Sequence, residues 1–274
     1  MTKPRTGRFA LGLTIVAVPL VLALLGPLFT GEPGRRTASF TLGDGHWIGT
    51  DFVGRDVWQL VLQGGRPVVL TALAATALSY LVALPVGLVG ALTHRRWLEE
   101  LLMRPLDVLL AVPSLLLILL AATVFSPDAV GLALLVALIN VPDAARLIRA
   151  AATEAAARPA VEALRMQGET WWRMAVGYVG RSIVRTLAAD AGIRLTGVLY
   201  LVATAAFLGI GVAPDAADWA VMVDRNRTGL FVQPWAVVVP ALLIVSLTMG
   251  TNLLFDTALA DGRRRDRAGS EARP

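Results

Sequence analysis

The chain has no cysteine, one lysine and two histidines among its 274 residues. Without cysteine it can form no disulfide and no thiolate site for catalysis or zinc. A P-loop needs a lysine against the nucleotide phosphates, and Lys3 has no glycine-rich frame around it. These absences exclude thiol chemistry and nucleotide binding through a P-loop.

The residues that metal sites and hydrolytic sites need are also scarce. The span assignment below predicts that His46 and His94 lie on opposite sides of a membrane, and neither a G-x-S-x-G nor an H-E-x-x-H motif occurs. Metal sites need clustered histidine, cysteine or carboxylate ligands. We therefore expect no metal, no cofactor and no catalytic residue, and a protein that is not an enzyme.

Charged residues make up only 16% of the chain, whereas 56% of it is hydrophobic and the mean hydropathy is +0.66. A soluble domain rarely reaches such values because its surface must be wetted. The net charge of +5 and pI near 10.6 would suit nucleic-acid binding. The arginines lie beside apolar spans, however, which indicates membrane topology and no nucleic-acid partner.

Six apolar segments each approach the roughly 20 residues that a helix needs to cross a bilayer. They are residues 9–29, 68–92, 106–125, 129–145, 187–211 and 236–259. Pro19, Pro85 and Pro113 interrupt three of them, which bundled membrane helices tolerate. The sequence predicts an all-α membrane protein with six transmembrane helices.

The first segment, within residues 1–29, could be a cleaved signal peptide because Lys3, Arg5 and Arg8 precede it. Its apolar run exceeds the usual signal length of about 7–15 residues, and no small-x-small cleavage site follows Phe29. We expect an uncleaved N-terminal transmembrane helix.

Orientation follows from the basic residues, which concentrate on the cytoplasmic side. Placing the N-terminus inside puts 19 of the 25 basic residues inside. Both termini are then cytoplasmic. The extracytoplasmic parts are a loop at 30–67, a turn at 126–128, and residues 212–235, where Trp219 and Trp235 are expected to anchor at the headgroups. The tail at 260–274 is charged and predicted to be disordered.

Within the predicted transmembrane domain at 68–259, residues 143–185 form a polar insert with seven arginines on the cytoplasmic side. Glu162, Ala163 and Leu164 suit a short helix, and Gly168 suits the turn that ends it. Such a helix could dock a soluble partner in a groove. Because Glu and Ala are simply good helix formers, a solvated helix explains the insert equally well.

Few ionisable groups lie within the spans. Asp107 is near the inner end of the third segment, and Asp190 and Arg194 are spaced i,i+4 in the fifth. They could pair locally at the interface, or they could line the inner mouth of a pathway.

The predicted external loop ends in the eleven residues His46–Asp56. Its glycines suit tight turns, and its charged residues could simply order the loop, with Arg55 between the carboxylates of Asp51 and Asp56. The loop resembles the H-x-x-G-T-D-x-x-G-R-D signature of the permease subunits of dipeptide, oligopeptide and nickel ABC importers. The matching motif residues are Gly49, Thr50, Asp51, Gly54, Arg55 and Asp56.

The resemblance extends over roughly residues 46–256. The residues at 99–116, 144–150, 207–211 and 218–220 are similar to stretches of that family. Glu162-Ala163-Leu164 with Gly168 resembles its E-A-A-x-x-x-G coupling segment, with Leu164 in place of the second alanine. Two further departures are Gly180-Arg181, where the family has Leu-Pro, and Val202, where an acidic residue is common.

The resemblance implies a type I ABC importer permease, in a bacterial cytoplasmic membrane, that forms half of the translocation pathway. Its partners would be a second homologous permease subunit, two ATP-binding subunits and an extracytoplasmic substrate-binding protein. The solute would be a peptide, nickel or a similar small solute. The alternative is a stand-alone secondary transporter or channel, which the scarcity of charges within the spans disfavours.

Overall fold

The computed structural model describes residues 4–31, 36–43, 45–93 and 95–271, with side-chain surroundings for residues 10–256 within these ranges. The described residues form helices and loops without a β-strand, apart from two isolated bridges in the loop before the second helix. The α-helices are α1 Pro4–Leu25, α2 Val57–Leu92, α3 Arg96–Leu110, α4 Ser114–Phe125, α5 Ala129–Ala156, α6 Pro159–Met166, α7 Arg181–Phe207, α8 Trp219–Asn226 and α9 Trp235–Glu271. A π-helical segment, Arg173–Gly180, leads directly into α7.

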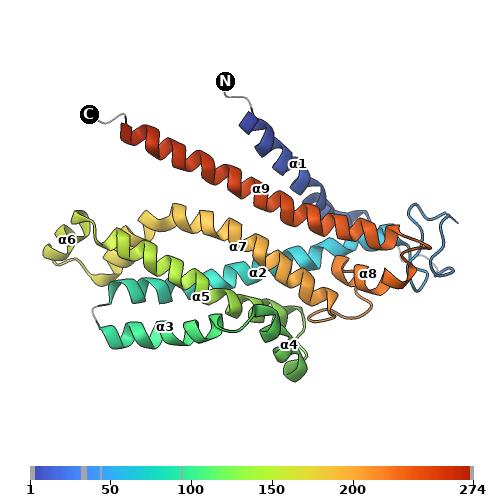
Figure 1. Cartoon of the computed structure of the whole chain (residues 1–274), viewed down its shortest axis with the longest axis horizontal. Helices are drawn as coiled ribbons and strands as arrows, with labels where there is room; N and C mark the ends of the chain where they lie inside the picture. Colours follow the sequence, from blue (N-terminus) through green and yellow to red (C-terminus); the bar gives the residue numbers. More distant parts are fainter. Residues whose placement is uncertain (1–3, 32–35, 44, 94, 272–274) are drawn as a thin grey trace.

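Among the described residues, five helical spans are long and apolar enough to cross a membrane, and the bent pair α3–α4 makes a sixth when it is counted as one span. In Figure 1 successive spans run in alternating directions between two ends of the molecule. One end carries residues 36–56 and α8, and we call it the loop end. The other carries α6, and the far end of α9 points towards it. This alternation agrees with the six-span prediction.

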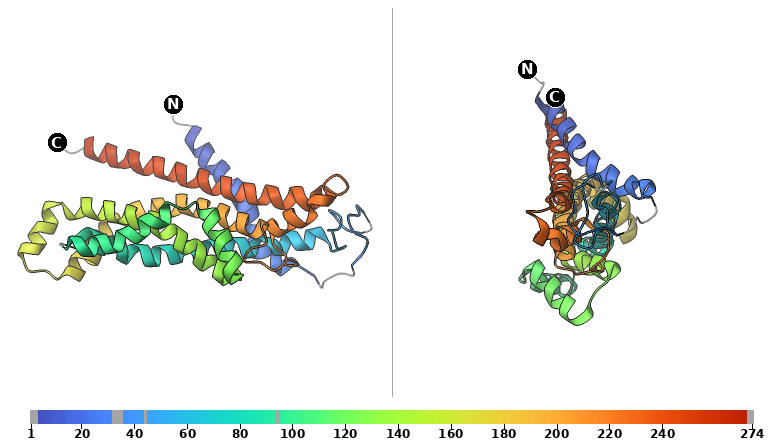
Figure 2. Two further views of the ribbon diagram at one scale, coloured as in Figure 1. Left: turned by 60° about the horizontal axis from the view of Figure 1, so that its bottom comes forward. Right: turned by 90° about the vertical axis from the view of Figure 1, so that its right-hand side faces the viewer.

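The spans lie in three layers, with α1 and α9 on one side, α2, α5 and α7 in the middle, and α3 with α4 on the other (Figures 1 and 2). Small residues let the helices approach closely, as membrane helix packing requires. A Cβ on Gly87 of α2 would lie 2.6 Å from the Ile148 side chain of α5, and one on Gly250 of α9 would lie 2.8 Å from Val16 N of α1. The glycines therefore determine these two helix contacts.

The helix α2 begins at Val57, earlier than predicted. Residues 57–67 were expected in the external loop. Asp56 caps the helix by accepting a hydrogen bond from Trp58 N over 2.8 Å. Gly64 and Gly65 resemble helix breakers in the sequence, but they make room for the Trp219 ring, which a Cβ on either residue would overlap.

The helix α5 continues past the predicted end of the fourth segment. It runs through Asn140 and Pro142 to Ala156. Residues 143–156, expected within the polar insert, are therefore the last turns of α5. Ala145, Ile148 and Ala152 are buried there, and this buried face explains why the helix persists among arginines.

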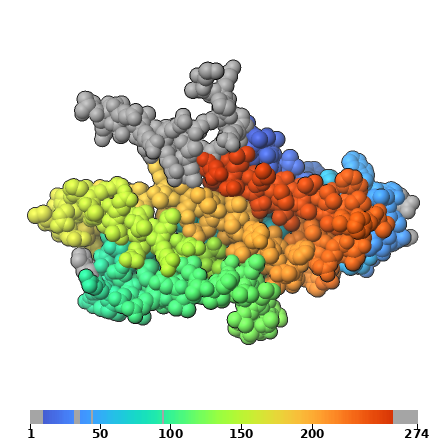
Figure 3. Space-filling view, viewed as in Figure 1, coloured from blue at the N-terminus to red at the C-terminus, as the bar shows by residue number. Residues whose placement is uncertain are grey.

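The third predicted span is broken into α3 and α4, which meet at an angle of 89°. Pro113 follows the break, and the residue before a proline is disfavoured in helical conformation. Only Ile118 of α4 is buried, and α4 projects from the lower edge of the molecule, in green, in Figure 3.

The tail also differs from its prediction, since α9 continues as a helix to Glu271. Extending an existing helix avoids the costly nucleation step, which favours helix over a disordered chain. His94 and the basic residues Lys3, Arg35 and Arg273, on which parts of the sequence argument depend, lie outside the described residues.

Candidate functional site

The residues predicted to be functional lie at opposite ends of the molecule. Those around Asp51 are in residues 36–56, which we call the motif loop, at the loop end (Figure 1). Those around Glu162 are in α6 at the other end (Figure 1). They therefore form two separate sites.

The motif loop folds back on itself through backbone hydrogen bonds. Thr37 N donates to Gly54 O over 3.0 Å, and Thr50 N donates to Thr41 O over 3.0 Å. Gly49 and Gly54 have φ of +80° and +78°, which glycine adopts without strain. A Cβ on Gly54 would overlap the Thr37 carbonyl, so the motif glycines are needed for this fold of the loop.

Asp51 is the buried centre of the loop. Its side chain is 1% exposed, and Arg55 Nε donates to its Oδ2 over 2.8 Å. Its Oδ1 accepts from Arg55 N over 2.7 Å and from Val53 N over 3.0 Å. Arg55 Nη1 also donates to Asp215 O over 2.8 Å, which ties the loop to the segment before α8.

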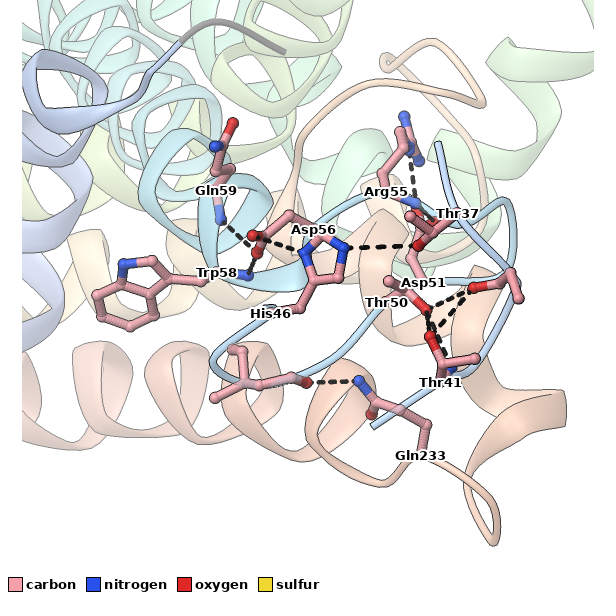
Figure 4. A network of polar contacts seen from close by, with 12 residues as sticks. Thr37, Thr41, His46, Thr50, Asp51, Arg55, Asp56, Trp58, Gln59 and Gln233 are labelled. Carbon is pink, nitrogen blue, oxygen red and sulfur yellow. Dashed lines mark hydrogen bonds and ion pairs between the residues drawn. The ribbon is translucent and has the colours of Figure 1, made fainter. Parts of the chain in front are cut away.

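Asp56 has a different role from the one predicted, since Arg55 does not bridge Asp51 and Asp56. Asp56 Oδ1 caps α2, and its Oδ2 lies 3.0 Å from His46 Nδ1 (Figure 4). The prediction of an arginine between two carboxylates is therefore wrong, because the chain direction at the start of α2 turns Asp56 towards His46.

Thr50 is fully buried and completes the network. Its hydroxyl donates to Ala38 O over 2.8 Å and accepts from Thr41 N over 2.9 Å. The motif residues Gly49, Thr50, Asp51, Gly54, Arg55 and Asp56 thus occupy one structured loop. Their role there is positional, because hydrogen bonds within the protein satisfy the buried groups.

Two polar residues that the sequence did not single out bind this loop to the rest of the chain. Gln233 is buried, and its Nε2 donates to Ile48 O over 2.6 Å while its Oε1 accepts from Ala236 N (Figure 4). Asn226 Oδ1 accepts from Phe52 N over 2.9 Å. The sequence signal that could have identified Gln233 is that it is a lone polar residue between apolar neighbours.

Trp219 was expected at the headgroups, but it is 0% exposed. Its Nε1 donates to Val61 O over 2.8 Å, so the indole packs inside the bundle instead. The preceding Asp218 caps α8 by accepting from Ala220 N over 2.8 Å. Burial raises the pKa of Asp218 to about 6, against an opposing effect of the backbone N–H groups it accepts from.

At the opposite end, α6 is a helix of eight residues that presents Glu162 and Ala163 to the outside. Val161 is its one buried residue and packs in the same cluster as Ala155 and Val179. Glu162 Oε2 lies 3.7 Å from Arg165 Nη1, and both side chains are well exposed. Such a pair contributes little to stability, so Glu162 is available to a partner.

Gly168 ends α6 with φ of +75°. Gly168 N donates to Arg165 O over 3.0 Å, and Glu169 N donates to Leu164 O over 3.1 Å. This pair of bonds is the Schellman arrangement, in which a left-handed residue satisfies the last carbonyls of a helix. A cavity of about 390 Å³ lies beside this turn, lined by residues that include Leu164, Glu169 and Tyr178.

Beyond the turn, the π-helical segment and α7 form one continuous helical stretch. The π-helical segment ends at Gly180, and α7 begins at Arg181. Gly180-Arg181, which stands where the resemblance led us to expect Leu-Pro, thus lies inside continuous helix. An arginine at 181 keeps a backbone N–H that proline would lack.

The ionisable residues predicted near the spans all find partners. Asp190 and Arg194 form an ion pair of 2.9 Å, and Tyr80 of α2 donates to Asp190. Asp107 of α3 pairs with Arg146 of α5 over 2.5 Å. No group of three or more possible metal ligands occurs among the described residues.

The model of the family described as "Binding-protein-dependent transport system inner membrane component" matches residues 83–260. This range covers both the turn at Gly168 and all of α7.

Relatives match over most of the chain. The "Probable D,D-dipeptide transport system permease protein DdpC" of Escherichia coli (strain K12) is 28% identical over 247 residues, covering 88% of this chain and 82% of the relative. The "Dipeptide transport system permease protein DppC" of Alkalihalophilus pseudofirmus is 25% identical over 249 residues, covering 89% and 82%.

A solved structure has a similar fold. An inward-facing form of the MetNI methionine ABC transporter matches with a TM-score of 0.57 at 14% identity, covering 72% of this chain and 95% of the matched chain. The fold is therefore that of an ABC importer permease.

Proposed function

The chain belongs to the family of binding-protein-dependent transport system inner membrane components and is a permease subunit of an ABC importer; we propose that it forms half of a translocation pathway with a second, homologous permease. Two ATP-binding subunits would bind at the α6 end, and an extracytoplasmic substrate-binding protein at the loop end. The family comprises transport permeases of the bacterial inner membrane rather than enzymes. It does not favour a stand-alone secondary transporter.

The observation that carries the proposed coupling role is the arrangement of α6. A helix of eight residues projects Glu162 and Ala163 outwards, is held by Val161, and ends at a glycine with φ of +75°. A short exposed helix of this kind fits a groove on a partner. Glu162, Ala163, Leu164 and Gly168 are the proposed ATPase-coupling residues.

We propose that the substrate-binding protein docks on the motif loop. The pair of the buried Asp51 with Arg55 and the bonds of the loop to Asp215, Asn226 and Gln233 fix its shape against α8 and the segment before α9. A preorganised surface loses less entropy when a partner binds. The motif residues would therefore support docking by holding the loop rather than by touching the partner.

For the solute we propose a peptide. The two relatives described above are named for transport of D,D-dipeptides and dipeptides. The sequence resemblance also left nickel open, but neither of these names mentions it.

The test is reconstitution of this chain with the second permease, the ATPases and the binding protein in liposomes. Uptake of a labelled dipeptide should require ATP and the binding protein. Uptake by this chain alone, driven by an ion gradient without ATP, would establish the secondary-transporter alternative instead.

A further inference from the structure

One face of α7 is left uncovered by the rest of the chain. Thr186, Ile193, Gly197 and Tyr200 are exposed on it, and their spacing of three, four and seven residues places them on one side of the helix. Within the span Arg173–Phe207 22% of the apolar window is buried, against 28% in the spans of α1 and α9 and 50% in the span of α5. The uncovered face of α7 therefore meets something outside this chain.

Apart from Ile193, this face carries small or polar residues over several turns. Thr204 and Asp190 lie on the same side as Thr186 and Tyr200 by helical spacing. The Tyr200 side chain is well exposed, and its hydroxyl has no hydrogen-bond partner among the described residues. A hydroxyl without a partner is costly in hydrocarbon. Lipid tails are thus a poor environment for this face.

The exposed faces of the other long spans differ from it. In α5 and α9 the exposed large side chains within the apolar stretches are Val130, Leu134, Leu138, Leu242, Val245 and Met249. These faces suit lipid tails. Because both kinds of face occur in one protein, the polar face of α7 is a local feature rather than a general property of the chain.

The charges beside this face are balanced. Asp190 pairs with Arg194 over 2.9 Å, their side chains are 13% and 10% exposed, and Tyr80 of α2 donates a further hydrogen bond to the carboxylate. Ionisable groups inside a membrane span usually mark a solute or ion path. The pair keeps this region polar without adding net charge.

We propose that the face of α7 formed by Thr186, Gly197, Tyr200 and Thr204, with the Asp190–Arg194 pair beside it, lines a water-filled solute pathway. Tyr200 hydrogen-bonds to the passing solute, and the Asp190–Arg194 pair suits a solute whose own charges balance, such as a zwitterionic peptide. This inference rests on the proposed function, because it takes the chain as one half of a permease pair.

The absence of cysteine makes the test direct. Single cysteines replace Thr186, Gly197 or Tyr200 on the face, with Leu138→Cys and Leu242→Cys as controls on apolar faces. No atom lies within 4 Å of a Cβ on Gly197, so Gly197→Cys needs no rearrangement. Each variant is reconstituted with its partner subunits and exposed to a sulfonate-bearing methanethiosulfonate or to the lipid-soluble N-phenylmaleimide.

We expect the charged, water-soluble reagent to label the three positions on α7 and to leave both control positions unlabelled. Labelling of Tyr200→Cys by the lipid-soluble reagent alone, as for Leu242→Cys, would show a lipid-facing surface and overturn the inference. Labelling by neither reagent would show a dry contact with another subunit and would equally overturn it.

ATP-driven uptake by the unsubstituted transporter is measured alongside. Uptake together with an unlabelled α7 face refutes this inference and leaves the proposed function intact. Uptake that does not depend on ATP refutes the proposed function itself. Tyr200→Phe supplies a second measurement, since it keeps the ring and removes the hydroxyl: uptake should fall with ATPase binding unchanged, and unaltered uptake contradicts solute contact at Tyr200.

Discussion

Arg55 Nε donates to the buried carboxylate of Asp51 over 2.8 Å, and this pair holds the motif loop at the loop end of the bundle. Two backbone N–H groups also donate to the same carboxylate. The arginine is partly exposed while the aspartate is not, so removal of Arg55 leaves a buried charge with only part of its compensation.

Arg55→Ala should loosen the motif loop and reduce uptake while the protein stays in the membrane. The loss is about 1–3 kcal/mol of loop stability, as expected when a charged group loses a hydrogen bond. Limited proteolysis from the loop end measures the loosening of the loop, and dipeptide uptake measures the loss of transport. Arg36→Ala is the matched control, because Arg36 is exposed in the same loop. Equal protease resistance in both variants would contradict this role for Arg55.

Glu162→Lys should abolish ATP-driven transport without unfolding the protein. The exposed carboxylate contributes little within this chain, but reversing its charge removes a contact to the ATPase for which about 1.5–3 kcal/mol is typical. That loss weakens the complex at least about tenfold. Co-purification of the ATPases reports it, with Glu154→Lys as a control on exposed α5 surface. Full ATPase recovery with Glu162→Lys would mean that α6 is not the coupling element.

Gly168→Ala should destabilise the turn after α6 by about 1 kcal/mol, the cost of a left-handed conformation for an ordinary residue. No atom lies within 4 Å of a Cβ at either Gly168 or Gly177. Only Gly168 has a positive φ, so Gly177→Ala controls for the added methyl group. Thermal unfolding in detergent compares the two variants. Equal unfolding temperatures would exclude conformational strain at Gly168.

Trp219→Phe should lower the free energy of unfolding by about 1–3 kcal/mol, because it removes the hydrogen bond to Val61 O and leaves a small cavity. Trp235→Phe is the matched control, since Trp235 is about half exposed at the start of α9. Thermal unfolding of the two purified variants gives the difference. A larger effect at Trp235 would indicate that the headgroup anchor predicted from the sequence outweighs core packing.

Asp218 predicts a pH dependence of stability. Burial raises its pKa in the folded protein to about 6 from an ordinary value of 3.8. The folded state therefore binds this proton more tightly than the unfolded state, and the Asp218 contribution to stability rises as pH falls from above 6 towards 4. Asp218→Asn, which keeps the capping oxygen, should remove that contribution. Identical stability changes between pH 7 and pH 5 in the two proteins would contradict the raised pKa.

The sequence predicted the spans well where hydropathy alone decides. The predicted segments at 9–29, 187–211 and 236–259 correspond to α1, α7 and α9 because their apolar runs are long and bounded by polar residues. Gly168 was identified as a turn residue because glycine is the residue that adopts positive φ freely. Those predictions depend on local chemistry, which a single sequence carries.

The errors come from partners that are distant in sequence. Trp219 was placed at the headgroups because nothing near it in the chain reveals Val61, 158 residues away. Gln233 was missed because its partner, Ile48, is 185 residues away. The 89° bend between α3 and α4 was missed because apolar residues continue on both sides of Pro113. Hydropathy cannot distinguish a straight span from a bent one.

The unbroken helical path from Arg173 to Phe207 has a mechanical consequence. Its 35 residues make a rod of about 50 Å at ~1.5 Å per residue. Tyr80 holds this rod at Asp190, midway along its length. Because the path has no break, its two ends are mechanically connected. Under the coupling role proposed for α6, a displacement produced there by ATP binding would be carried along this helix to Phe207, so that a change at one end of the molecule reaches the other without an intervening joint.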